Sequence, residues 1–265
     1  MKLEDWIRHR ELTGQVTFSS AEVTQAFSDK SDLTLKRAIL RAIATGRIQS
    51  VRSGFYVIVP PQYALKGVVP ASYYLDAMMH WMKKPYYACL LTAAAFHGAG
   101  HQRAMQTQVM TIPPKAHSSQ KNTQIQWNYR QQIPEELLQK ANAEMGVILY
   151  SNPELTAVDL IQYASHIGGY QRAATVLAEL VDAMDMNRMT AVFPYAQSAT
   201  LQRLGYILEF VLEETKTADA LYSLCSEQMK KLHTVKMGPQ FPRKEGNEQN
   251  RWRVNMNIDI DIDEI

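Results

Sequence analysis

The sequence predicts an α+β protein in which an N-terminal winged helix-turn-helix domain precedes a mixed α/β C-terminal domain. Two patterns lead to this fold class. Residues 31–60 combine an amphipathic helix with two short extended segments, and later segments mix helical with alternating apolar spacing. With 265 residues, 46% of them apolar, the chain is long enough for two hydrophobic cores. We assign residues 1–64 to the winged domain and 67–265 to the second, with the boundary near Lys66.

The predicted recognition helix of the winged domain lies between Ser31 and Gly46. Ser31 can cap its first turn, and Gly46 supplies the left-handed conformation that ends it. Its apolar residues form one stripe, at Leu35, Ala38, Ile39, Ala42 and Ile43. Its other side carries Thr34, Arg37, Arg41 and Thr45. The spacing therefore predicts two arginines one turn apart on an exposed face.

A predicted hairpin follows this helix and completes the winged motif. Arg47–Val51 and Phe55–Val59 are rich in β-branched and aromatic residues, and Ser53-Gly54 between them suits a tight turn. A helix fits the major groove, arginines pair with guanine edges or phosphates, and a basic hairpin can contact the adjacent backbone. We therefore expect this region to bind double-stranded DNA.

The alternative is an ordinary solvated helix face on a protein-interaction module. Local charge favours DNA, because residues 30–52 contain six basic side chains and a single acid, Asp32. The formal net charge of the whole chain is only +2, so a nucleic-acid site must be local.

Two further helices support the predicted winged domain. Lys2–Glu11 places Leu3, Trp6 and Ile7 on one face, and Ser19 with Glu22 forms a capping box that opens a helix to Phe27. Prolines end the second strand of the hairpin, and we expect a joint over Pro61–Pro70.

The second domain is predicted to mix helices and strands. The expected helices are Ser72–Lys83, Tyr86–His97, Pro153–Ala164, Tyr170–Ala183, Ala199–Glu214 and Ala218–Lys231. The expected strands are Val109–Ile112, Gln124–Arg130, Gly146–Tyr150 and Arg251–Ile265. Residues 124–130 alternate, with Ile125, Trp127 and Tyr129 on the predicted buried face. Ser151 and Glu154 have the spacing of a capping box, and Gly146–Tyr150 is predicted to be buried.

Histidine and aspartate patterns indicate metal binding only weakly. His97 and His101 have the spacing of a helical zinc pair, but the glycines between them argue against a helix, and we expect a structural role for this loop. Asp259, Asp261 and Asp263 line up in the last predicted strand, where an edge protected by charge explains them as well as a cation does. We expect no metal site.

Catalytic motifs are equally weak. Glu214 and Lys216 resemble the acid-x-lysine of some nucleases, but they lie in a helical pattern. We expect no catalytic residues, no cofactor and no enzyme activity, with a nuclease-like enzyme kept as an alternative. Two isolated cysteines, Cys89 and Cys225, and the absence of a long apolar run predict a cytoplasmic protein without a membrane span.

Several segments resemble the AbiEi family of antitoxins from type IV toxin-antitoxin and phage-defence systems. They are GFYVIVPP (54–61), YLDAMM (74–79), PYYACLLTAAAFHGAGHQ (85–102), SNPELTAVDL (151–160) and RWRVN (251–255). The resemblance covers nearly the whole chain. It implies an N-terminal winged domain that represses the toxin-antitoxin operon and a C-terminal domain that counters a nucleotidyltransferase-type toxin.

The resemblance also names residues that would face operator DNA. They are Thr34, Lys36, Arg37 and Arg41 on the helix, and Arg47 and Arg52 on the wing. No toxin-countering residue follows from it, nor whether the toxin is contacted directly. A stand-alone transcriptional regulator without a toxin partner is the other open interpretation.

Overall fold

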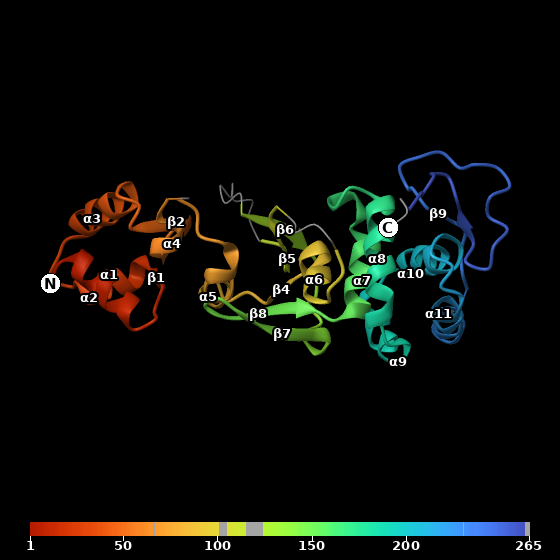
Figure 1. Ribbon diagram of the computed structural model, residues 1–265, viewed down its shortest axis with the longest axis horizontal. Helices are drawn as coiled ribbons and strands as arrows, with labels where there is room; N and C mark the ends of the chain where they lie inside the picture. The colour runs from red at the N-terminus through yellow and green to blue at the C-terminus, as the bar shows by residue number, and fades with distance from the viewer. Residues whose placement is uncertain (66, 101–104, 115–123, 230, 263–265) are drawn as a thin grey trace. The chain divides into compact units, whose positions relative to one another are not determined.

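The structure, a computed structural model, describes residues 1–65, 67–100, 105–114, 124–229 and 231–262 (Figure 1). It is a mixed α+β fold, as predicted. The α-helices are α1 (Leu3–Leu12), α2 (Ser20–Ala26), α3 (Asp32–Ala44), α4 (Pro61–Ala64), α5 (Leu75–Trp81), α6 (Leu90–Phe96), α7 (Pro153–Gln162), α8 (Tyr170–Leu180), α9 (Met186–Met189), α10 (Ser198–Tyr206) and α11 (Thr215–Gln228). The strands are β1 (Thr17–Ser19), β2 (Ile48–Arg52), β3 (Phe55–Ile58), β4 (Tyr86–Ala88), β5 (Thr107–Thr111), β6 (Ile125–Tyr129), β7 (Leu138–Ala143), β8 (Gly146–Ser151), β9 (Val235–Lys236) and β10 (Val254–Asn255).

Chain contacts divide the protein into two compact units. The first comprises Met1–Tyr86, Thr111–Gln131 and Lys140–Leu149, and the second Tyr87–Met110, Gln132–Gln139 and Tyr150–Ile265. The predicted domain boundary at Lys66 lies outside the described residues. The division into 1–64 and 67–265 therefore stays a prediction.

Helices α1, α2 and α3 pack with a three-stranded antiparallel sheet of order β1-β3-β2 in the first unit. Ser19 begins α2 as predicted, since its side chain accepts a hydrogen bond from the Glu22 amide and its own amide donates to the Glu22 carboxylate. The shared core contains Leu3, Trp6, Ile7, Phe18, Val23, Phe27, Leu35, Ile39, Ala42, Ile48 and Ile58. Each large apolar side chain buried there stabilises the fold by about 1.5–3 kcal/mol.

The first unit continues through contacts that span the predicted joint. Gln49 Oε1 accepts a hydrogen bond from the Val69 amide at 2.9 Å. The rings of Phe55 and Trp81 pack with centroids 5.2 Å apart. Cutting the chain near residue 66 would therefore separate the hairpin from the helix that covers one of its aromatic residues.

A five-stranded sheet has the order β6-β5-β4-β8-β7. Strand β4 corrects the prediction of one helix over Tyr86–His97, because residues 86–88 are extended and pair in parallel with β8 through Ala88 and Tyr150. The helix starts only at Leu90, whose φ is +53°. A short apolar run fits a buried strand and a buried helix equally well, and here the pairing with β8 decides.

The buried face of β6 also differs from the prediction. Asn128 and Arg130 are buried, whereas Tyr129 is 39% exposed. The Arg130 amide donates to the Thr111 carbonyl at 3.0 Å. Strand β8 is only partly buried, with Ile148 and Ser151 inaccessible. Alternation in a sequence shows that a strand has two faces but does not say which one the rest of the chain covers.

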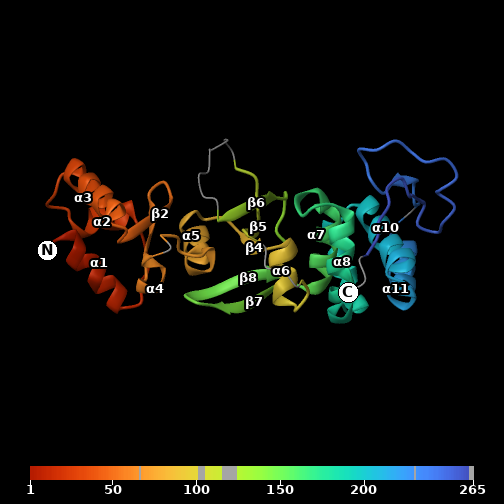
Figure 2. The ribbon, with the colours of Figure 1, turned by 45° about the horizontal axis from the view of Figure 1, so that its top comes forward.

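Helix α7 of the second unit packs against α6, α8, α9 and α10. Figure 2 shows it beside α8, between α6 and α10. All of its residues from 153 to 161 are buried. Its cap is Asn152, whose Oδ1 accepts from the Leu155 amide at 2.9 Å, so the predicted capping box from Ser151 to Glu154 is wrong. Glu154 accepts instead from the Asp185 amide at 2.7 Å. A residue before proline adopts the extended backbone that an N-cap needs, which favours Asn152.

The C-terminal segment is mostly coil, so the prediction of a strand over 251–265 is wrong. Among the described residues 251–262, Val254–Asn255 alone form a strand, in parallel with β9. Asn257, predicted to face solvent, is buried, and its Nδ2 donates to the Gly238, Phe241 and Pro242 carbonyls. The side-chain amide of Asn257 thus supplies a donor to backbone carbonyls of the loop at 238–242.

Candidate nucleic-acid interface

Helix α3 begins and ends as its sequence predicts. The Ser31 hydroxyl accepts from the Thr34 amide at 3.4 Å and lies 2.9 Å from the Thr34 hydroxyl. At the other end the Gly46 amide donates to Ile43 O and the Arg47 amide to Ala42 O, with φ of +68° at Gly46. This pair of bonds is a Schellman motif, which fixes the end of the helix.

Thr34, Lys36, Arg37 and Arg41 of α3 are exposed to solvent, which the helical spacing predicted for Thr34, Arg37 and Arg41. Thr34, Arg37, Leu40 and Arg41 together line a surface hollow. Within the described part of the chain, no carboxylate forms an ion pair with Lys36, Arg37 or Arg41. These cations are therefore available for a ligand outside the chain, and phosphates and guanine edges are ligands of the right chemistry.

The hairpin of β2 and β3 follows α3, with Arg52 beside its turn. A β-bulge lies between Ser50 and Arg52, and Gly54 takes a φ of +79° in the turn. A bulge bends the strand and re-aims the following side chain. Arg52 is partly exposed at this tip.

Arg47, another predicted DNA-facing residue, is paired within the fold. Its guanidinium forms an ion pair with the Glu11 carboxylate of α1, and both side chains are about one-third exposed, at 34% and 30%. An arginine already paired within the fold contributes less to a phosphate contact, because binding would first have to break the pair. The structure thus places Arg47 as a link between α1 and the hairpin.

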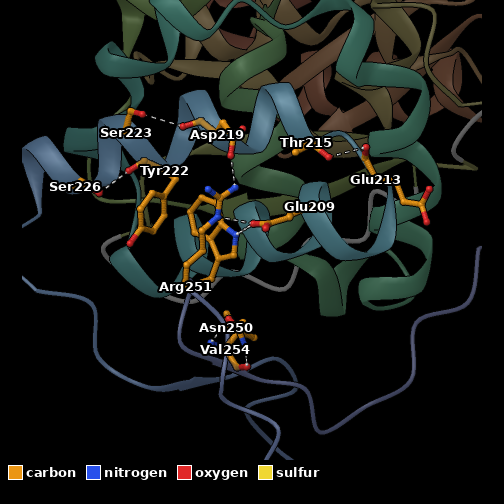
Figure 3. Close-up of polar contacts among 11 residues, drawn as sticks. Glu209, Glu213, Thr215, Asp219, Tyr222, Ser223, Ser226, Asn250, Arg251 and Val254 are labelled. Carbon is orange, nitrogen blue, oxygen red and sulfur yellow. Dashed lines mark hydrogen bonds and ion pairs between the residues drawn. The ribbon is translucent and has the colours of Figure 1, made fainter.

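A second polar cluster, which we call the C-terminal clasp, joins Glu209, Asp219, Arg251 and Trp252. Figure 3 shows the first three of these residues. Glu209 Oε2 accepts from Arg251 Nε and from Trp252 Nε1, each at 2.7 Å. Arg251 Nη2 lies 2.7 Å from Asp219 Oδ1. The two carboxylates raise the pKa of Arg251 against the opposing effect of burial.

The backbone that carries the clasp is unusual. Glu209 lies on a single π-helical turn, Ile207–Val211, that continues α10. Trp252 is fully buried, and a Cβ atom added at Gly205 would overlap its ring. The side-chain Nε2 of Gln202 donates to the Trp252 carbonyl at 2.6 Å. The sequence reasoning missed this cluster, although the RWR run at 251–253 in a polar segment was a signal for it.

Buried polar groups around α7 have structural partners. Tyr87 donates to Asp159 Oδ2 at 2.7 Å, and His97 Nε2 lies 2.8 Å from the Ser151 carbonyl. Burial lowers the pKa of His97, opposed by that carbonyl and by Glu154. A structural role for His97 fits these contacts, while His101 lies outside the described residues.

Metal ligands do not gather in the part of the chain that the structure describes, where no group of three or more His, Cys, Asp or Glu side chains could hold an ion. Asp259 pairs with Lys244 at 3.2 Å, and Asp263 lies outside the described residues.

Glu214 precedes α11 and Lys216 lies in its first turn. Neither cysteine forms a disulfide. No helix among the described residues is long and apolar enough to cross a membrane.

One stretch of the chain matches a known family. Residues 86–210 match the AbiEi antitoxin C-terminal domain. The chain carries an AbiEi antitoxin domain. This domain runs from β4 to the π-helical turn, so it includes Glu209 of the clasp but not Arg251. Its presence supports an antitoxin role in a toxin-antitoxin system.

A solved structure has a similar fold. It is that of the Rv2827c protein from Mycobacterium tuberculosis, which is 15% identical in sequence, with a TM-score of 0.62. The match covers 83% of this chain and 79% of that one, so the likeness in fold extends beyond the AbiEi domain. No protein of curated function matches the sequence.

Proposed function

We propose that this protein is the antitoxin of a type IV, phage-defence toxin-antitoxin system and represses its own operon. In this proposal residues 1–64 form a winged helix-turn-helix that binds double-stranded operator DNA, and residues 67–265 counter a nucleotidyltransferase-type toxin. The AbiEi domain supports the antitoxin role. The observation that supports DNA binding is the exposed basic face of α3, followed by a hairpin with Arg52 at its tip.

Substitution of the α3 arginines tests the DNA-binding half. Arg37→Ala and Arg41→Ala should each weaken binding to the DNA upstream of the coding sequence by about 1–3 kcal/mol, because a groove-facing arginine pairs with base edges. Arg52→Ala should weaken specific and random DNA alike and lower the salt slope by about one. Arg8→Ala, exposed on α1, is the matched control. Unchanged affinities of the α3 variants, measured by titration at several salt concentrations, would contradict the groove assignment.

Arg47 was assigned to the DNA-facing set by family resemblance, and its pair with Glu11 refines that expectation. Arg47→Ala should lower the stability of the N-terminal core more than it lowers DNA affinity. Glu11→Gln is the matched test, since it releases Arg47 without removing it. If Glu11→Gln raises DNA affinity and Arg47→Ala in the same background removes that gain, the freed guanidinium contacts DNA.

The antitoxin half is tested in cells that express the adjacent toxin gene. The full chain carrying Arg37→Ala and Arg41→Ala, expressed from an unrelated promoter, should still rescue growth while failing to bind DNA. A fragment of residues 67–265 should also rescue, and a fragment of residues 1–64 should not. Loss of rescue in the folded arginine variant would show that the two functions are not separate. Where no nucleotidyltransferase-like gene adjoins, a stand-alone regulator is the better proposal.

A further inference from the structure

Helix α3 exposes leucines on the same side as its arginines. Leu40 is 64% and Leu33 58% exposed, and they lie seven residues apart, or about two helical turns. Leu40 is three residues from Arg37 and adjacent to Arg41, and it lines the surface hollow with both. Scattered surface leucines are common, but these form an apolar edge beside a basic face.

A second copy of this chain is a poor partner for that edge. In a two-fold contact through α3, the same face meets itself, so Arg37 and Arg41 of both copies would approach one another. Asp32, at the start of α3, is the one acid in this helix. Like charges brought together without carboxylates oppose association. The basic surroundings of Leu40 instead suit a polyanion that carries an apolar group.

The major groove of DNA offers such a group. Each thymine places its C5 methyl in the groove beside acceptor atoms, and guanine N7 and O6 accept from arginine. A leucine between two arginines matches this alternation of apolar and acceptor groups. We propose that Leu40 reads a thymine methyl group next to base pairs contacted by Arg37 and Arg41, an inference that rests on the proposed operator binding.

The test removes the methyl from the DNA and the apolar side chain from the protein. The DNA immediately upstream of the coding sequence is prepared with thymine and, in parallel, with uracil. The full-length wild type should bind the uracil DNA about fourfold more weakly for each methyl that Leu40 contacts, the ratio expected from burying one methyl-sized group. Leu40→Ala should bind thymine DNA about fourfold more weakly and lose nothing further on uracil DNA.

A matched variant and two other measurements make the test decisive. Leu12→Ala removes a leucine that is 80% exposed on α1, so it should respond to uracil as the wild type does. If Leu40→Ala and the wild type lose equal affinity on going from thymine to uracil DNA, the inference is overturned, because the methyl group would then be contacted by another residue. The inference would also be overturned by a Leu40→Ala variant that turns a dimer into a monomer in sedimentation, since the edge would then bind protein. Failure of the wild type to prefer this DNA over scrambled DNA would instead refute the proposed function.

Discussion

Substitution of Gly205 by alanine is predicted to destabilise the second unit, against the ordinary effect of this change in a helix. Gly205 lies in α10, and a Cβ atom there would overlap three ring carbons of the buried Trp252. The ring has little freedom to move away. Its Nε1 donates to Glu209 at 2.7 Å, and its backbone carbonyl accepts from Gln202 at 2.6 Å.

The magnitude follows from three opposing contributions. Alanine is favoured over glycine inside a helix by about 1 kcal/mol. Overpacking a core costs about 1–3 kcal/mol, and losing a hydrogen bond to a charged group costs about 1.5–3 kcal/mol. If the ring shifts enough to break the bond to Glu209, the net destabilisation is about 1.5–5 kcal/mol. The sign of the effect therefore reports whether Trp252 packs on Gly205.

Urea unfolding followed by far-ultraviolet circular dichroism measures this sign. Gly205→Ala should lower the midpoint of the transition that belongs to the second unit. In a Trp252→Ala background the same substitution has nothing to overlap and should be neutral or stabilising, so the two changes should couple strongly. A raised midpoint for Gly205→Ala in the otherwise unchanged protein would refute the packing argument.

Three further predictions concern buried groups of the second unit. Burial lowers the pKa of His97 in the folded protein. The stability that neutral His97 contributes is therefore present above its ordinary pKa of about 6.5 and is lost as the pH falls below 6.5. His97→Asn should flatten the pH dependence of the urea midpoint below pH 6.5. Burial raises the pKa of Cys225 to about 12, and Cys89 is fully buried, so neither thiol should react with a disulfide reagent until the protein unfolds in urea. Tyr87→Phe removes the donor to Asp159 and should lower stability by about 1.5–3 kcal/mol in the same titration, whereas an unchanged midpoint would show that the carboxylate finds another donor.

Local signals explain why the N-terminal part was predictable. The Ser19 and Ser31 caps, the Gly46 stop and the Ser53-Gly54 turn each act within a few residues, and all lie where the sequence placed them. The exposure of Arg37 and Arg41 follows from the same helical spacing. Leu33 and Leu40 fall opposite the buried stripe by that spacing too, so their exposure was available from the sequence but not drawn from it.

Partners far apart in sequence explain the errors. Arg47 was expected on the surface by its type, and only the fold brings Glu11 to it. Asn257 fits a strand by alternation, yet the carbonyls of a loop around residue 240 bind it. The clasp depends on a tryptophan at 252 meeting a glycine at 205. Such pairings are set by tertiary packing, which spacing along the chain does not encode.

The clasp makes the last part of the chain a closed loop. Arg251 and Trp252 are hydrogen-bonded to Glu209, and residues 243–249, which lie between Glu209 and Arg251 in the sequence, are exposed coil. A protease that cuts after Arg243 would therefore break the polypeptide without releasing a piece, because residues 251–257 would stay anchored by Trp252 and Asn257. The nicked protein should migrate as one species under native conditions and as two only in denaturant, because the break lies in an exposed segment whose two flanks both stay attached to the fold.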